Sequence, residues 1–549
     1  MSDTGPQVRA EDVQKLRDTV EAAQAGELPR AFALAQSALA EGLEHPFFFR
    51  MRALLREQQG LLDEAIADFQ AALAGAPDDP AVLNALGLCL ARTGRFGESL
   101  RALDAAIARA PGFGAALANR GWVLENLGEL ASARAAYERA LQADPANVRA
   151  LGGLAVMAAR RGEAAQARAH AQAALAVAPQ DAAANIALAT AELGEGEAVG
   201  AETRLRGLLA LPRLPAHDRA VALSLLGDAL DLQDRTSEAF AAWTDANRTL
   251  RTLHQPRIEQ GRIEPGAAMA ERLARSFRET PPSAWRGAPK AAGAAPASTH
   301  VFLVGFPRSG TTLIGQVLAA HPQVVTLDEG EFLAEAAGSL LAPGRDIGRL
   351  ADMDEAALAP YREAYWRRVR AAAPGLDGKV LVDKLPMNVL GLPLIARLFP
   401  EARVLFVRRD PRDVVLSCFR RQFVVNGANW EFLDLEGAAR FYAAVMGLFE
   451  LYRERLADLE LRVQGYEALV DDFAGETAAL CGVLGLDPDA GMARFADASR
   501  TRDIATPSAG QVARGLYADG VGQWRRYAAE LEPVLPILGP WAERFGYAS

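Results

Sequence analysis

A glycine-bearing loop joins a short apolar run to a helical stretch in the second half of the chain. The apolar run is His300–Gly305, and the loop FPRSG follows it before the helical stretch TTLIGQVLAA. Glycines allow backbone N–H groups to point at an anion, and the start of a helix adds partial positive charge. The pattern G-x-x-x-x-G-T-T therefore predicts a phosphate cradle, made by Arg308, Ser309, Gly310, Thr311 and Thr312. An ordinary glycine turn between a strand and a helix is the alternative.

One position of this loop differs from the pattern of nucleotide triphosphatases. Those enzymes place a lysine after the second glycine, where it contacts the β- and γ-phosphates, and this chain has Thr311 there. Arg308 instead puts a positive charge inside the loop. The difference disfavours an ATPase, a GTPase or a kinase, and the chain also lacks the acidic strand that binds a metal ion in those enzymes.

A second group of anion-binding side chains follows about a hundred residues later. Residues 403–410 (RVLFVRRD) read as a buried strand that ends in charge, and Pro411 suits the first turn of a helix. Ser417 and Arg421 stand four residues apart, so we expect them on one face of that helix. With Arg409 they form a candidate site for a second phosphate. The alternative is a set of surface ion pairs, made by Arg412 with Asp410 and by Asp413.

The two segments together resemble the sulfotransferase superfamily, over about residues 298–549. The first segment resembles its 5′-phosphosulfate loop and the second its 3′-phosphate motif. The resemblance implies the co-substrate 3′-phosphoadenosine-5′-phosphosulfate (PAPS), which carries phosphate at both ends of its ribose, and it implies no bound metal. The similarity is greatest to the protein-tyrosine sulfotransferase type and its bacterial relatives with helical repeats. The segments that carry it are PRSGTTL, HPQVVTLDEGEF, VDKLPMN, RRDPRDVVLSCFRRQF, GYEALVDD and TPSAGQV…YADGVGQWRRYAAEL.

The resemblance implies three catalytic residues. Glu329, eight residues after His321, corresponds to the base that takes the proton of the acceptor hydroxyl. Lys384 and Arg308 correspond to the cations that stabilise charge on the sulfuryl group and the leaving phosphate. A solvated acidic turn is the alternative for Glu329.

The resemblance also implies which residues bind PAPS. The 5′ end corresponds to the loop residues 308–312, and the 3′-phosphate corresponds to Arg409, Ser417 and Arg421. Tyr466 matches a tyrosine placed near the nucleotide, and a core tyrosine at the end of a strand is its alternative. Relatives often carry a serine shortly before the Trp524-Arg525 pair, but this chain has Gly520 in that region. Either the backbone N–H of Gly520 replaces the serine, or activity is weakened.

The first half of the chain repeats with a period of 34 residues. Glycine recurs at Gly26, Gly60, Gly94, Gly128, Gly162 and Gly196, and proline at Pro77, Pro111, Pro145 and Pro179. Glycine suits the turn between two helices, and proline ends the second helix of a unit. The pattern predicts stacked helix–turn–helix units, because one unit cannot bury its apolar face alone. The predicted repeats are 46–79, 80–113, 114–147, 148–181 and 182–215, with a further unit near 220–253.

This spacing resembles the tetratricopeptide repeat (TPR) family. The resemblance covers about residues 12–253, and it implies that the array binds a protein or peptide. A passive scaffold or an oligomerisation surface is the alternative. Residues 254–297 are expected to hold one more helix and a linker rich in Pro, Ala and Gly, before the domain at 298–549. The predicted fold is an all-α TPR solenoid followed by an α/β, P-loop-like sulfotransferase domain with a parallel sheet.

Composition excludes several other classes of protein. The net charge of −10 argues against a binder of nucleic acid or of an anionic membrane. Three scattered cysteines do not form a disulfide framework, so we expect buried thiols and a reducing, cytoplasmic compartment. The six histidines form no metal-binding pattern. The polar N-terminus and the lack of a long apolar run predict neither a signal peptide nor a membrane span.

The sequence therefore predicts an enzyme that transfers a sulfuryl group from PAPS to a hydroxyl, most simply a tyrosine of a protein or peptide engaged by the array. A carbohydrate, lipid or small-molecule hydroxyl is the first alternative acceptor. A TPR scaffold that binds nucleotide without catalysis is the second alternative. The sequence leaves the oligomeric state and any regulation by the array open.

Overall fold

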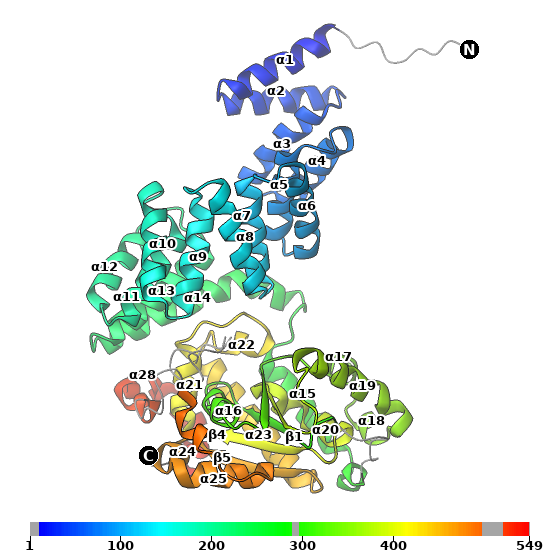
Figure 1. The fold of residues 1–549 in the computed structure, drawn as a ribbon, viewed down its shortest axis with the longest axis vertical. Coiled ribbons are helices and arrows are strands. Elements are labelled where there is room, and N and C mark those ends of the chain that lie inside the picture. Colours follow the sequence, from blue (N-terminus) through cyan, green and yellow to red (C-terminus); the bar gives the residue numbers. More distant parts are fainter. Residues whose placement is uncertain (1–9, 288–295, 497–519, 548–549) are drawn as a thin grey trace. The chain divides into compact units, whose positions relative to one another are not determined.

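The computed structural model of the chain describes residues 10–287, 296–496 and 520–547. The chain forms two compact units, which are Met1–Glu197 and Ala198–Ser549 (Figure 1). Within the described residues, no helix is both long and apolar enough to span a bilayer.

The first unit is an array of antiparallel helix pairs. Its helices are α1 (Ala10–Gln24), α2 (Leu28–Ala40), α3 (Pro46–Gln58), α4 (Leu62–Gly75), α5 (Pro80–Arg92), α6 (Phe96–Arg109), α7 (Gly114–Asn126), α8 (Leu130–Ala143), α9 (Val148–Arg160), α10 (Ala164–Val177) and α11 (Ala182–Gly194). The periodic glycines lie in the turn of each pair with φ between 72° and 83°, where a side chain would be strained. The helices α3, α5, α7, α9 and α11 begin at residues 46, 80, 114, 148 and 182, as the 34-residue spacing predicts.

Glycines inside the helices allow neighbouring helices of the array to approach closely. Tyr137 of α8 is fully buried between Gly121 of α7 and Gly153 of α9. A Cβ atom on Gly121 would lie 2.6 Å from the Tyr137 ring, and one on Gly153 would lie 2.4 Å from it. The large side chain and the two glycines therefore form one packing unit across three helices.

The second unit opens with four helices and continues into an α/β domain. The four helices are α12 (Ala198–Leu209), α13 (Ala216–Asp231), α14 (Thr236–Glu259) and α15 (Gly266–Glu279). The helices of the α/β domain are α16 (Thr311–Ala319), α17 (Ala334–Leu340), α18 (Gly348–Ala351), α19 (Glu355–Ala372), α20 (Leu392–Leu398), α21 (Pro411–Phe419), α22 (Gly427–Glu431), α23 (Leu435–Arg455), α24 (Tyr466–Asp471), α25 (Phe473–Leu484), α28 (Ala528–Leu531) and α29 (Leu535–Arg544).

The α/β domain is built on one parallel sheet of five strands. The strands are β1 (Thr299–Gly305), β2 (Val324–Asp328), β3 (Val380–Lys384), β4 (Arg403–Arg408) and β5 (Glu460–Gly465), in the order β2-β3-β1-β4-β5. Every adjacent pair is parallel, and β1 lies at the centre. The predicted architecture, a helical repeat array followed by an α/β domain with a parallel sheet, is confirmed.

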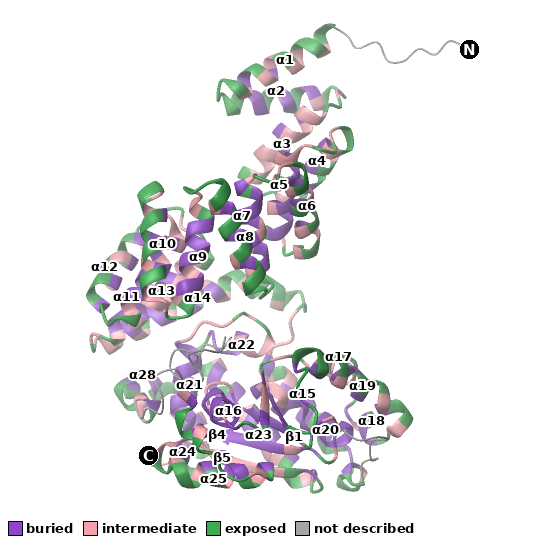
Figure 2. Cartoon of the chain, viewed as in Figure 1, coloured by how far each residue is buried: buried purple, intermediate pink, exposed green. Residues whose placement is uncertain are grey.

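Both faces of the sheet are covered, so its strands are largely buried (Figure 2). On one face Leu303 of β1 belongs to a core with Ile314 of α16 and Leu480 of α25. On the other face Phe406 of β4 stacks on Phe449 of α23, with ring centroids 3.6 Å apart. Burial on both faces explains why these strands read as continuous apolar runs in the sequence.

The segment predicted as a linker is not wholly a surface segment where the structure describes it. Trp285 is 3% exposed, and its ring lies 4.7 Å from that of Phe277 on α15. Residues 288–295, which hold most of its Pro, Ala and Gly, lie outside the described residues. The tryptophan packs because an indole buries more apolar area than the small residues around it.

Candidate active site

The predicted site residues lie at one edge of the sheet. Parallel strands present their carboxyl ends at the same edge, and open α/β sheets bind ligands there. The register aligns these ends closely, since Asp328 pairs with Lys384 and Arg408 pairs with Gly465. The last residues of the five strands are Gly305, Asp328, Lys384, Arg408 and Gly465.

The phosphate loop connects β1 to α16 through two residues with positive φ. Arg308 has φ 70° and Gly310 has φ 105°. A left-handed backbone is unfavourable for arginine, and such strain is concentrated at functional sites. A Cβ atom on Gly310 would lie 2.5 Å from the Tyr466 ring, so this position requires glycine. Ser309 and Thr312 are buried at the start of α16, as a cradle for an anion requires.

The structure brings the two predicted anion-binding segments into contact. The Arg308 Nε donates a hydrogen bond of 3.0 Å to the Ser417 Oγ. The Arg409 Nη1 donates one of 3.1 Å to the backbone carbonyl of Arg308, and its guanidinium lies 4.9 Å from the centre of the Tyr466 ring. Residues far apart in the sequence therefore form one cluster at the ends of β1 and β4.

This cluster carries unusual positive charge for a buried place. Burial, together with repulsion from Arg421, Arg409 and Arg420, lowers the pKa of Arg308 to about 10. The Nε atoms of Arg409, Arg420 and Arg421 are buried and have no hydrogen-bond partner among the described residues. Buried cations with unpaired donors are costly unless an anion binds to them. The arrangement is therefore suited to a phosphate or sulfate group.

The candidate base and the candidate lysine form an ion pair. The Lys384 Nζ lies 3.0 Å from the Glu329 Oε1 and 3.2 Å from the Asp328 Oδ1. Lys384 is fully buried, whereas the side chain of Glu329 is 34% exposed. The Glu329 backbone has φ 49°, and its N–H donates a hydrogen bond of 2.8 Å to the Lys384 carbonyl. A strained turn thus holds an accessible carboxylate beside a buried ammonium group.

Arg421 does not lie on the helix that carries Ser417. The helix α21 ends at Phe419, whose backbone carbonyl accepts a hydrogen bond of 2.8 Å from the Asn247 Nδ2 of α14. The Arg421 Nη1 donates one of 2.7 Å to the Asp228 Oδ2 of α13. The prediction that Ser417 and Arg421 share a helix face is therefore wrong, although Arg421 is near enough to Arg308 to lower its pKa.

The ion pair between Arg412 and Asp410, expected as the alternative to a second phosphate site, is present. The Arg412 Nη2 lies 2.8 Å from the Asp410 Oδ2, and both residues are buried instead of lying at the surface. Asp413 has another role, since its carboxylate accepts hydrogen bonds from the backbone N–H groups of Gly522, at 2.7 Å, and Trp524, at 2.8 Å. These bonds hold the C-terminal segment against α21.

Sequence reasoning missed the partners that lie far away in the chain. Asp228 and Asp231 of α13 contact Arg421 and Arg420, and the Gly520 carbonyl accepts a hydrogen bond from Arg409. The one local signal was the pair of adjacent arginines 420 and 421, which follow the predicted helix with no acidic residue beside them in the sequence. The TPSAGQV motif and Asp519 lie outside the described residues.

The chain matches two family models. Residues 300–490 match the sulfotransferase family. Residues 50–112, 84–148 and 118–182 match the tetratricopeptide repeat. The matched regions correspond to the α/β domain and to the helical array described above.

Curated relatives match part of the chain. An uncharacterized protein of Aquifex aeolicus is 26% identical over 346 residues, which are 61% of this chain and 43% of that protein. A putative protein-tyrosine sulfotransferase of Caenorhabditis briggsae is 32% identical over 24% of this chain and 46% of its own length. Protein-tyrosine sulfotransferase 2 of Gallus gallus is 31% identical over 23% of this chain and 35% of its own length. The chain thus spans less than half the length of each of these relatives.

Solved structures also resemble part of the chain. A tetratricopeptide repeat protein from Parabacteroides merdae covers 43% of this chain, at 18% identity and a TM-score of 0.34, over 93% of its own chain. The two family matches, with the parallel sheet and the helix pairs, lead to one assignment. The chain carries a domain of the sulfotransferase family that follows an array of tetratricopeptide repeats.

Proposed function

We propose that the protein transfers a sulfuryl group from PAPS to a hydroxyl, and that the acceptor is a tyrosine of a protein or peptide. The observation that carries the proposal is the pair of sites at one sheet edge. A buried arginine cluster suited to anions lies at the ends of β1 and β4, and the Lys384–Glu329 pair lies at the ends of β3 and β2. Sulfuryl transfer needs both an anion site and an acid–base pair.

The residues at this edge fit a nucleotide with two phosphate-bearing ends. Ser309, Gly310, Thr311 and Thr312 begin α16 and would hold the 5′ end. Arg409, Ser417 and Arg421 would hold the 3′-phosphate, and the buried Nε atoms of the two arginines are donors without a partner among the described residues. Tyr466, packed against Gly310 and Arg409, would border the nucleotide between them.

The side chains supply what the reaction requires. When bound, PAPS supplies a sulfuryl group whose bond to a phosphate oxygen breaks as a bond to the acceptor oxygen forms. Glu329 accepts the proton that leaves the acceptor hydroxyl. Lys384 and Arg308 place positive charge beside the oxygens on which negative charge grows, and a group of this kind lowers the barrier by on the order of 2–4 kcal/mol.

Gly520, in the region where relatives often carry a serine, packs closely against two of the proposed nucleotide-binding residues. A Cβ atom there would lie 3.1 Å from the Tyr466 Oη and 3.3 Å from the Arg409 Nη2. These contacts are tight, so the packing of Arg409 and Tyr466 is adapted to glycine at this position. A side chain at this position would therefore displace Arg409 or Tyr466, and Arg409 uses the Gly520 carbonyl as an acceptor.

The acceptor and the compartment are supported by other features. Repeat arrays of this family bind proteins on extended surfaces, and two of the relatives are named protein-tyrosine sulfotransferases. The three cysteines are free and buried, which favours a reducing compartment such as the cytoplasm.

The test is release of 3′-phosphoadenosine 5′-phosphate (PAP) from PAPS, measured on tyrosine-containing peptides, simple phenols and sugars. We expect acceptor-dependent release on the peptides, reduced about 10²- to 10⁴-fold in Glu329→Gln with PAP affinity retained. Glu331→Gln, which changes an exposed glutamate two residues away, is the matched control and should keep full activity.

Each other result contradicts part of the proposal. Turnover only on sugars or small phenols would reject the peptide acceptor and keep the sulfotransferase. Tight PAP binding without release on any acceptor would indicate the scaffold. Failure to bind PAP would reject the function altogether.

A further inference from the structure

Four consecutive residues, the last residue of α21 and the three that follow it, all contact the helix pair α13–α14. Phe419 accepts a hydrogen bond from Asn247, and its ring stacks on Phe240 at 5.1 Å between centroids. The two arginines and the glutamine that follow bind α13, through Arg420 to Asp231 at 3.5 Å, Arg421 to Asp228 at 2.7 Å and Gln422 to the Ala220 carbonyl at 2.6 Å. Each residue of the segment 419–422 therefore has its own contact with α13 or α14.

Asp228 contacts only one edge of the Arg421 guanidinium. Its carboxylate binds Nη1, while the buried Nε has no partner among the described residues. An arginine held on one edge by a carboxylate retains donors in a known orientation for a second anion. The carboxylate therefore orients the arginine and leaves part of it for a ligand.

Asp231 fixes the same helix end to the C-terminal segment. Its carboxylate accepts hydrogen bonds from the Tyr527 Oη at 2.6 Å and pairs with Arg526 at 2.7 Å, besides Arg420. The C-terminal segment also contains Gly520, whose carbonyl binds Arg409. The Asp231 carboxylate thus connects the segment after α21 with the C-terminal segment, and both of these segments contact the anion cluster.

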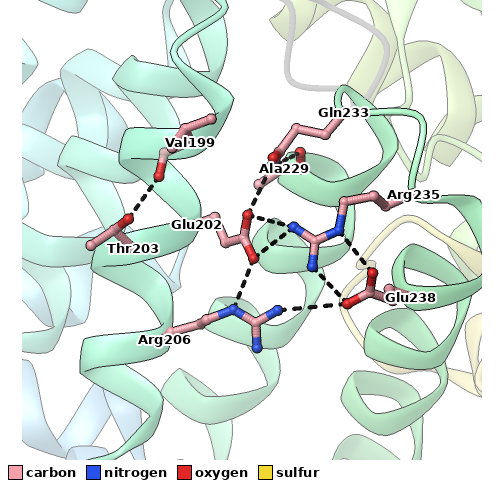
Figure 3. A network of polar contacts seen from close by, with 8 residues as sticks. All are labelled: Val199, Glu202, Thr203, Arg206, Ala229, Gln233, Arg235 and Glu238. Carbon is pink, nitrogen blue, oxygen red and sulfur yellow. Dashed lines mark hydrogen bonds and ion pairs between the residues drawn. The ribbon is translucent and has the colours of Figure 1, made fainter.

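A second ion network joins α12 to the turn between α13 and α14 (Figure 3). Glu202 of α12 pairs with Arg235 at 2.8 Å and with Arg206 at 2.9 Å. It also accepts a hydrogen bond of 2.9 Å from Gln233, and these bonds lower the pKa of Glu202 to about 2. Arg235 also pairs with Glu238 of α14. The turn after Asp231 is therefore held in place, and a rigid support is what a positioned side chain needs.

We propose that α13 belongs to the nucleotide site, and that Asp228 is a positioning residue that orients Arg421 toward the 3′-phosphate of PAPS. This inference rests on the proposed function. It adds a residue outside the segment 300–490 that matches the sulfotransferase family. It also makes the helices at the start of the second unit a requirement for nucleotide selectivity.

The experiment measures the affinities of the full-length protein for PAP and for 5′-AMP, which lacks the 3′-phosphate, by titration calorimetry. We expect Asp228→Ala to weaken PAP binding about tenfold and to leave 5′-AMP binding within about twofold, because one charge-assisted orientation is lost. Asp228→Asn should lose less affinity for PAP, since its amide oxygen still accepts the hydrogen bond from Arg421. Asp234→Asn is the control, because Asp234 is exposed and pairs only with Arg526 among the described residues.

The outcomes separate this inference from the function on which it rests. Wild type that does not prefer PAP over 5′-AMP would reject the proposed function and the inference together. Wild type that prefers PAP, with Asp228→Ala unchanged, would overturn the inference alone. Equal loss of affinity for both ligands would show that Asp228 has a merely structural role. Tighter PAP binding in both Asp228 variants would show that its carboxylate competes with the phosphate. Either result would overturn the inference.

Discussion

Asp383 is a fully buried carboxylic acid next to the candidate catalytic lysine. Its Oδ2 accepts a hydrogen bond of 3.0 Å from the Tyr365 Oη, which lies 2.7 Å from the His300 Nε2. Its Oδ1 has no partner among the described residues. Burial raises the pKa of Asp383 from 3.8 to about 7, although the bond from Tyr365 opposes this. The acid is therefore protonated in the folded protein at a pH where it ionises in the unfolded chain.

This difference predicts a stability that falls as pH rises from about 4 to about 7. In that range the folded state holds one more proton than the unfolded state, so raising the pH favours unfolding, by about 4 kcal/mol in all. Asp383→Asn should flatten the slope and be more stable than wild type at pH 8. Denaturant unfolding between pH 4 and 8 measures this, with the exposed Asp377→Asn as control. An unchanged slope in Asp383→Asn would contradict the prediction.

At the residue scale, the sequence predicted which groups carry chemistry better than it predicted their partners. The loop of Arg308 and the strand end of Lys384 could be read locally, because glycine spacing and apolar runs are local signals. The contacts of Asp228 with Arg421 and of Gly520 with Arg409 join residues more than a hundred positions apart. No local pattern encodes such contacts, because they depend on packing of the finished fold. The assignment of roles to these residues stays a prediction.

At the scale of elements, α21 shows what turn chemistry determines. Asp410 caps the helix by accepting a hydrogen bond of 2.9 Å from the Arg412 N–H, and Pro411 occupies the first turn as the sequence predicts. The same carboxylate neutralises the buried guanidinium of Arg412, which lies 3.8 Å from the centre of the Trp524 ring. The contact at the end of the helix was not predictable, because Asn247, which binds the Phe419 carbonyl, lies on another element far away in the sequence.

Two aspartate caps should therefore differ in their effect on stability. Asp410→Ala removes both the cap of α21 and the carboxylate that pairs with the buried guanidinium of Arg412, so we expect a loss of about 3–5 kcal/mol. Asp354→Ala removes only the exposed cap of α19, which accepts a hydrogen bond of 3.0 Å from the Ala357 N–H, and should cost about 1 kcal/mol. The free energy of unfolding from denaturant titration compares them. Equal losses would show that the buried pair adds nothing beyond capping.

At the scale of the whole molecule, the chain consists of two units with different sources of stability. The first, Met1–Glu197, is held by packing between neighbouring helices. The second, Ala198–Ser549, contains the sheet, the arginine cluster and the helices α12–α14. The 34-residue period predicted the helix pairs of the array, but it could not show that the last of these helices join the compact unit of the α/β domain.

This division predicts two unfolding transitions in calorimetry of the full-length protein. PAP at a hundred times its dissociation constant should stabilise only the second unit, by about 2.7 kcal/mol, because binding favours the unit that holds the site. Gly153→Ala should lower only the midpoint temperature of the first unit, by several degrees, since its Cβ atom would lie 2.4 Å from the Tyr137 ring.

Gly194→Ala is the matched control for that transition. Its added methyl group would meet nothing within 4 Å, and alanine favours a helix. The midpoint temperature of the first unit should therefore be unchanged or higher. If one transition responded to both PAP and Gly153→Ala, the two units would unfold as one. Nucleotide binding would then be coupled to the packing of the repeat array. Two independent transitions would instead confine the effect of nucleotide to the unit that begins at Ala198.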